Sequence, residues 1–182
     1  MADPTPRSAR VKGIPFTDVM VRAVLAGHKT QTRRLKDTYR VGDWLYIREA
    51  WCAGRTTVDG EPFHWFARRA DSSREAWPDR IRNEHARVYE RWSSAWRPAR
   101  FMFGALARPV VLEVTDRRVE LLQDISEADA KAEGSWTRPG FRDVWEDSYR
   151  HAFREAWDQI NGPDSWNANP NVTAYTFKVT TP

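Results

Sequence analysis

The sequence predicts a small α+β domain: a partly closed β-barrel with flanking helices and a long insertion. Three observations favour this fold class. Several short runs alternate apolar and polar residues as half-buried strands do, a few segments have helical spacing, and no segment is repeated. A length of 182 residues with 41% hydrophobic and 30% charged residues suits one globular domain with a sizeable core. This composition excludes a disordered or collagen-like chain.

The first expected elements are an arm and a helix. Residues 1–12 combine prolines and positive charges with little apolar content, so we expect a flexible basic arm, followed by a single domain over 13–182. A helix is expected over 18–26, because Thr17 can cap its first turn and Gly27 can end it.

The next part of the chain predicts strands interrupted by an insertion. Alternating threonines at 30–32 indicate a loop that passes into a strand, and the run at 44–48 predicts a buried strand that Trp51 closes. Residues 52–108 have no clear period beyond a strand-like alternation at 63–69. We interpret 52–108 as a long insertion into the domain.

The C-terminal part predicts strands and two helices. One long bent strand or two shorter ones are expected within 109–122, and a short capped helix over 126–133 is ended by Gly134. Apolar residues at helical spacing predict a longer helix over 141–160. Alternation over 172–179 predicts the final strand.

The composition also excludes several function classes. Cys52 is the only cysteine and the four histidines lack metal-ligand spacing, so we expect no disulfide and no metal. Neither a G-x-G-x-x-G nor a Walker A segment occurs, so dinucleotide and nucleotide-hydrolysing chemistry lack their phosphate cradles, and no cofactor is expected. With no apolar stretch long enough to span a bilayer and no secretory signal, we expect a soluble cytoplasmic protein without a membrane partner.

The charge balance favours a polyanionic partner. Lysine and arginine total 29 against 25 acidic residues, which gives a net charge of +4. Most of the basic residues are arginines, whose planar guanidinium pairs with phosphate and stacks on bases. We therefore expect RNA, single-stranded nucleic acid or a modified nucleoside as partner.

The segment LAGHKTQTRR at 25–34 concentrates cations and hydroxyls directly after a helix stop. It resembles the L-x-G-x-K-T-x-(E/T)-x-R signature of the ASCH domain, a member of the PUA-like superfamily of small β-barrels linked to RNA and modified nucleosides. The similarity extends to 41–45, 110–116 and 125–134 and covers about 11–181. The long middle and the C-terminal loop resemble the larger phage and prophage members, which implies the cytoplasm of a bacterial cell or a phage-infected host.

The resemblance implies an activity and its residues. Small bacterial members hydrolyse N4-acetylcytidine with a lysine and a threonine of the signature and a glutamate near the end of the later helix. Lys29, Thr32 and Glu133 occupy these places. A hydroxyl needs a base to attack, and lysine is a base only when its pKa falls well below about 10.4. Burial and the cations Arg33 and Arg34 would lower that pKa, whereas a carboxylate close by would raise it. Glu133 is therefore expected to be protonated or held at some distance, as an acid or substrate ligand.

Further contacts and two alternatives complete the prediction. The large insertion leaves two other functions open: a non-catalytic nucleic-acid-binding module, and a phage morphogenesis accessory protein that acts through protein contacts. Residues expected to contact nucleic acid or substrate are Thr30, Arg33, Arg34, Arg48, Trp51 and Trp136.

Overall fold

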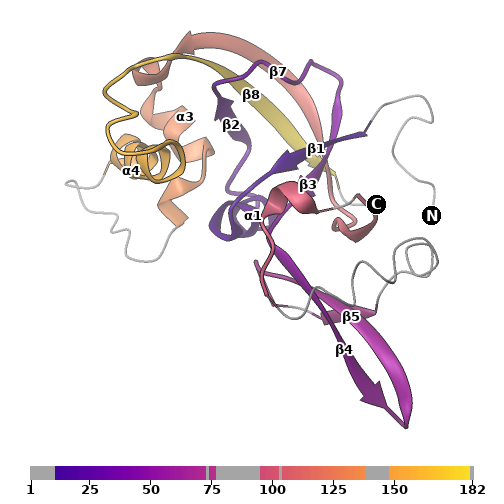
Figure 1. The fold of residues 1–182 in the computed structure, drawn as a ribbon. Coiled ribbons are helices and arrows are strands. Elements are labelled where there is room, and N and C mark those ends of the chain that lie inside the picture. Colours follow the sequence, from indigo (N-terminus) through magenta and orange to yellow (C-terminus); the bar gives the residue numbers. More distant parts are fainter. Residues whose placement is uncertain (1–10, 73, 77–94, 103, 138–147, 181–182) are drawn as a thin grey trace.

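The protein consists of two sheets and three α-helices in the part of the chain that the structure, a computed structural model, describes: residues 11–72, 74–76, 95–102, 104–137 and 148–180. The larger sheet has five strands in the order β1-β3-β7-β8-β2 (Figure 1). Its strands are β1 (Val11–Pro15), β2 (Gln31–Arg34), β3 (Trp44–Arg48), β7 (Val111–Leu121) and β8 (Asn171–Thr180).

This larger sheet is curved and open. β1 runs parallel to β3 and the other neighbours are antiparallel, with a bulge in β7 between Val114 and Asp116. β1 and β2 are the edge strands, so no closed barrel forms among the described strands. The expected α+β class is thus confirmed, whereas the barrel is not.

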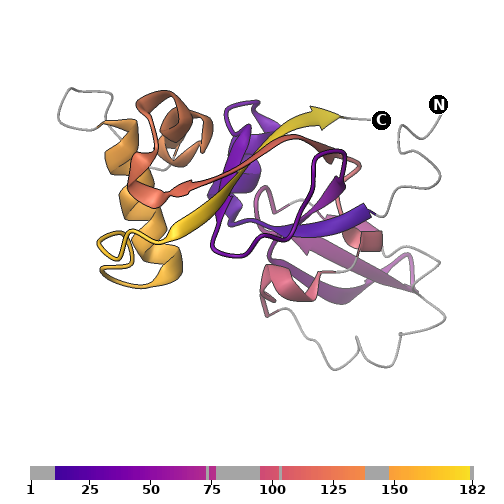
Figure 2. The same cartoon turned by 90° about the horizontal axis from the view of Figure 1, so that it is seen from above.

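A smaller sheet projects from the main sheet as a long hairpin with one added strand (Figures 1 and 2). It contains β4 (Trp51–Val58), β5 (Glu61–Arg68) and β6 (Arg74–Ala76). The described part of the region predicted as an insertion thus contains a sheet, and Trp51 begins the first strand of this sheet rather than closing the strand before it. The sheet has its own small core, made by Trp51, Ala53, Phe66, Met102 and Leu106.

Each α-helix starts at a hydroxyl residue whose side-chain oxygen accepts a backbone hydrogen bond from the first turn, as N-caps do. The caps are Thr17, Ser126 and Ser148, as expected for the first two. The α-helices are α1 (Asp18–Leu25), α3 (Glu127–Ala132) and α4 (Tyr149–Asn161). Short 3₁₀ turns are η1 (Ala99–Phe101), η2 (Gly104–Leu106), η3 (Leu122–Asp124) and η4 (Ser135–Thr137). None of the helices in the described ranges is long and apolar enough to cross a membrane.

The helices α3 and α4 gather at one end of the main sheet, on the far side from the hairpin (Figure 1). Under them lies a core cluster built around Leu122, Ile125, Phe153, Trp157 and Trp166. In the main core, the apolar face of α1 packs with buried residues of the large sheet.

Several predicted boundaries need correction. The basic arm was expected to reach residue 12, but Val11 and Lys12 already belong to β1, and 1–10 lie outside the described residues. The region 109–122 holds one strand, β7, whose bulge explains why two strands also fitted its pattern. The long helix begins at Tyr149, while 141–147 lie outside the described residues.

Candidate functional site

A cavity of about 540 Å³ opens between the two edge strands of the large sheet. One wall comes from the end of β1 and the start of α1, the second from β2, and the third from α4. Such volumes are typical of small-molecule sites. The lining includes Phe16, Lys29, Thr32, Glu133, Phe153 and Trp157.

The backbone after α1 places Lys29 in the wall of this cavity. Gly27 adopts a positive φ of 74°, and the amides of His28 and Lys29 both donate to the carbonyl of Ala23. The Thr30 amide donates to the Ala132 carbonyl, and the Thr30 carbonyl accepts from Phe177. The segment is thereby fixed between the end of α3 and β8.

Lys29 and Glu133 form a buried ion pair. Both side chains are almost fully buried, and Lys29 Nζ lies 2.8 Å from Glu133 Oε2. Nζ also donates to the backbone oxygens of Gln31 at 2.7 Å and Glu133 at 2.9 Å. Of the two alternatives expected for Glu133, protonated or held at some distance from Lys29, the second is wrong, because Glu133 Oε2 is one of the three oxygen acceptors of Nζ.

The environment of Lys29 lowers its pKa in spite of this contact. Burial lowers the pKa of Lys29, since the charged form is poorly solvated there. Glu133 opposes this effect, while Arg34 and Arg33 lower the pKa further. The net direction is downward from 10.5, as a lysine that acts as a base requires.

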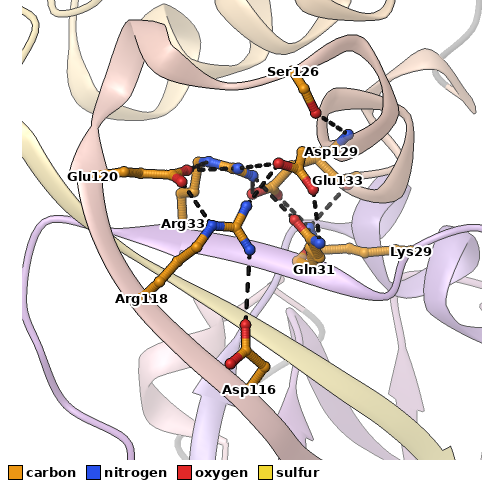
Figure 3. A network of polar contacts seen from close by, with 9 residues as sticks. All are labelled: Lys29, Gln31, Arg33, Asp116, Arg118, Glu120, Ser126, Asp129 and Glu133. Atoms are coloured by element: carbon orange, nitrogen blue, oxygen red, sulfur yellow. Dashed lines mark hydrogen bonds and ion pairs between the residues drawn. The ribbon is translucent and has the colours of Figure 1, made fainter.

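A network of ion pairs surrounds Glu133 (Figure 3). Arg33 is fully buried, and its guanidinium lies 3.1 Å from Glu133 Oε1 and 2.6 Å from Glu120 Oε1. It is also 3.4 Å from Asp129 Oδ2. Arg118 binds the other oxygen of Glu120 at 2.7 Å and the same oxygen of Asp129 at 2.6 Å. Glu133 therefore accepts Lys29 on one oxygen and Arg33 on the other, which fixes its orientation.

The network is close to electrically neutral. Its three cations are Lys29, Arg33 and Arg118, and its four carboxylates are Glu120, Asp129, Glu133 and the more exposed Asp116. Buried charges are tolerated when they are paired and hydrogen-bonded in this way. Arg33 was expected to contact nucleic acid, but its guanidinium is buried and already forms ion pairs with three carboxylates.

Two uncharged polar atoms in the cavity wall lack hydrogen-bond partners among the described residues. The Ser135 hydroxyl and the Trp157 indole nitrogen are buried without a hydrogen-bond partner among the described residues, and both residues line the cavity. A buried donor without a partner is costly, and a ligand with polar groups would supply one. α4 also contributes the apolar side chains Phe153, Ala156 and Ile160, together with Asn161 at its end.

Arg34 lies at the opening between the edge strands. Its Nη2 donates to the carbonyl oxygen of Pro15, the last residue of β1, at 2.8 Å. Its guanidinium also lies 5.4 Å from the centroid of the Phe16 ring. This one side chain thus bridges β2 to β1 where a closed barrel would have backbone pairing.

The other predicted contacts lie away from the cavity. Thr30 contributes only backbone hydrogen bonds, which hold the segment next to Lys29 in place. Arg48 lies on β3, beside Gly13. Trp51 is fully buried in the core of the small sheet, where its ring is out of reach of a base. Trp136 packs against Tyr149 and His28 and donates to the Lys131 carbonyl. The structure brings together Lys29, Thr32, Glu133 and Arg34, with Arg33 behind them.

Sequence reasoning missed the outer carboxylates and the wall formed by α4. A signal for the first was present: Asp129 and Glu133 are four residues apart on one helix face, and Arg118 and Glu120 are two apart on one strand face. No signal in the sequence indicated the cavity wall formed by α4. Helical periodicity shows that Phe153 and Trp157 point inward, but it does not show whether they pack in a core or line a cavity.

Comparisons with protein-family models, with curated proteins and with solved structures found no match for this chain. Among the described residues, no group of three histidine, cysteine or acidic side chains is arranged to hold a metal ion. The resemblance to the ASCH domain therefore rests on the motif at 25–34 and its neighbours.

Proposed function

We propose that the chain is an ASCH-type amidohydrolase that removes the acyl group from an N4-acylated cytidine, such as N4-acetylcytidine. The observation that carries the proposal is the convergence of Lys29, Thr32 and Glu133 on one cavity. These are the residues that the resemblance singles out, and Lys29 is 104 positions from Glu133 in the sequence.

The proposed reaction uses the threonine as nucleophile. Lys29 in its neutral form takes the hydroxyl proton of Thr32 as the threonine oxygen attacks the acyl carbon. The bond from that carbon to N4 then breaks, and N4 leaves with the proton held by Lys29. Water hydrolyses the threonine ester to the free carboxylic acid and restores Thr32. Glu133 orients Lys29 and stabilises its protonated state between these steps.

The rest of the cavity supports a nucleoside-sized ligand. Its volume of about 540 Å³ falls within the range of small-molecule sites. Phe16, Phe153 and Trp157 supply apolar and aromatic surface, and the Ser135 hydroxyl and the Trp157 indole supply unused hydrogen-bonding groups. A pyrimidine with its carbonyl and ring nitrogen matches both features.

One observation favours a second candidate, a non-catalytic binding site for the same ligands. Lys29 donates all three of its protons to oxygen acceptors, and a base needs a free electron pair. In a binding module this lysine would serve only to hold Glu133 and the end of α3.

The experiment that tests the proposal measures release of cytidine from N4-acetylcytidine by liquid chromatography. We expect turnover whose rate rises with pH through the lowered pKa of Lys29, because the neutral amine is the active form. Thr32→Val, which keeps the size of the buried side chain, should abolish turnover.

The matched control is Thr56→Val, at an exposed position of the hairpin strand β4, which should leave turnover unchanged. Cytidine binding by Thr32→Val, measured by calorimetry, separates loss of chemistry from loss of the site. Wild-type protein that binds cytidine but never cleaves an acylated cytidine would refute the amidohydrolase and favour the binding module.

A further inference from the structure

We propose that Arg34, assisted by Lys36, forms an anion subsite in the same cavity, and that the ligand is therefore a nucleoside carrying a phosphate ester rather than a free nucleoside. The inference rests on the proposed function, because it names the substrate class of that site. It is carried by a contrast between two adjacent arginines.

Arg33 and Arg34 differ in how their charges are compensated. Arg33 lies within 3.4 Å of three carboxylates, from Glu120, Asp129 and Glu133. Arg34 forms no ion pair with any residue that the structure describes; its one hydrogen bond to them goes to the carbonyl of Pro15. Most of the five N–H donors of the Arg34 guanidinium are therefore available to a ligand.

The environment of Arg34 makes this uncompensated charge costly. The side chain is partly buried against Phe16, and burial lowers its pKa from the usual value. A guanidinium in such a site is stabilised by a bidentate anion, for which its planar shape is suited. Glu133 acts on this charge without direct contact: it raises the pKa of Arg34 against the effect of burial, but its two oxygens are taken by Lys29 and Arg33.

The subsite lies beside the reacting groups. Lys29 Nζ and the Arg34 guanidinium are each 5.4 Å from the centroid of the same ring, that of Phe16. Lys36 is exposed and lines the same cavity, two residues beyond Arg34. One ligand can therefore place a base against the lysine and its phosphate against the arginine.

The test measures binding of the reaction products to the unmodified protein by calorimetry at low salt. The probes are cytidine, cytidine 5′-monophosphate and a short single-stranded oligonucleotide ending in cytidine. We expect the monophosphate to bind at least about tenfold more tightly than cytidine, since a charged hydrogen bond contributes about 1.5–3 kcal/mol. An oligonucleotide that binds more tightly than the monophosphate would assign the phosphate to a polynucleotide backbone.

Variants show whether Arg34 causes the preference. Arg34→Gln should bring the affinities for cytidine and its monophosphate close together, and Lys36→Gln, at an exposed position, should reduce the difference in part. Arg154→Gln removes an equal charge from an exposed position of α4 and should leave the preference unchanged. Thermal unfolding of each variant identifies any loss of fold, and Lys36→Gln remains informative if Arg34→Gln fails to fold.

The outcomes separate this inference from the proposed function. Equal binding of cytidine and its monophosphate overturns the subsite even if acylated cytidine is hydrolysed. A phosphate preference that depends on Arg34 supports the subsite even if no turnover is found. If Arg34→Gln lowers turnover of nucleoside and nucleotide substrates equally, the arginine acts at the reacting carbonyl and the subsite is overturned.

Discussion

The carboxylate of Glu133 is held from two sides, by Lys29 on Oε2 and by Arg33 on Oε1. Each partner is almost completely removed from water, so neither charge has an alternative source of solvation. The pair therefore contributes to the geometry of the site and makes each of its members hard to replace alone.

We predict that Lys29→Met lowers the free energy of unfolding by about 3–5 kcal/mol, because it leaves part of the Glu133 charge buried without a partner. Urea unfolding measures the change. The double variant Lys29→Met with Glu133→Leu should recover much of the loss, since it removes both charges.

Lys178→Met is the control for this prediction, as it replaces an exposed lysine of β8 and should change the stability little. A Lys29→Met protein that unfolds at the same urea concentration as the wild type would contradict it.

At the scale of elements, the turn after α3 brings the site together. Gly134 has a φ of 73°, and a Cβ at this position would lie 3.0 Å from the Cβ atoms of both Ala23 and Lys29. Glu133, the residue before it, caps the helix and carries the carboxylate. Glycine is thus required twice, for the backbone conformation and for the close approach of α1 and the lysine segment.

We predict that Gly134→Ala destabilises the protein by more than Gly27→Ala. Gly27 also has a positive φ, of 74°, but a Cβ there meets no atom within 4 Å. Gly27→Ala should therefore show only the conformational cost of about 1–2 kcal/mol, whereas Gly134→Ala adds the crowding against Lys29. Thermal unfolding of both variants gives the comparison, and equal losses would contradict the crowding.

Elements with strong local signals were predictable. The caps Thr17 and Ser126 and the alternation of 44–48 and 172–179 are consequences of short-range chemistry, and the observed elements agree within one or two residues. β4 was missed because it starts with Trp51, Cys52 and Ala53, which are all buried and do not alternate. Pairing with β5, a contact that short-range pattern does not reveal, makes that segment a strand.

The part of the site that could be predicted came from the motif, whereas the contacts among its residues depend on the tertiary structure. Lys29, Thr32 and Glu133 were expected to meet, and they line one cavity. The contact between Lys29 and Glu133 was not expected, because a lysine with a lowered pKa argues against a nearby carboxylate. Burial resolves this conflict, since it lowers the pKa of Lys29 by more than Glu133 raises it, and Arg34 and Arg33 add to the lowering.

At the scale of the whole molecule, many of the arginines form ion pairs with carboxylates of the protein itself. Ion pairs to carboxylates reduce the positive field that a polynucleotide would meet, and exposed pairs of this kind are weak but still neutralise charge. The count of 29 basic residues therefore overstates the charge available for phosphate contacts, and the net charge of +4 is the better measure. The arginines in such pairs include Arg33, Arg40, Arg68, Arg69, Arg108, Arg117 and Arg118.

One of these pairs ties the large sheet to the loop between β2 and β3, and it makes the stability of the molecule depend on pH. Asp37 in that loop accepts hydrogen bonds from Arg117 on β7 and from Tyr175 on β8. These contacts, the Arg117 hydrogen bond first, lower the pKa of Asp37 from 3.8 to about 2. The stabilisation is therefore complete above about pH 4 and is lost as the pH falls through about 2.

We predict that Asp37→Asn lowers the midpoint of thermal unfolding at neutral pH and that its difference from wild type shrinks on acidification toward pH 2. Asp59→Asn, in the exposed turn between β4 and β5, should show no such trend. A difference between Asp37→Asn and wild type that is constant with pH would show that the charge of Asp37 is not involved.

The open edge of the large sheet determines how fast a ligand can exchange with the cavity. Because β1 and β2 are not joined by backbone pairing, no ladder of hydrogen bonds has to break for a molecule to enter between them. The hydrogen bond from Arg34 to the Pro15 carbonyl joins the ends of these two strands, so a ligand that enters between them displaces one side-chain contact and no backbone pairing. We therefore expect differences in affinity at this site to follow how long the contacts inside the cavity persist, rather than how fast the ligand enters.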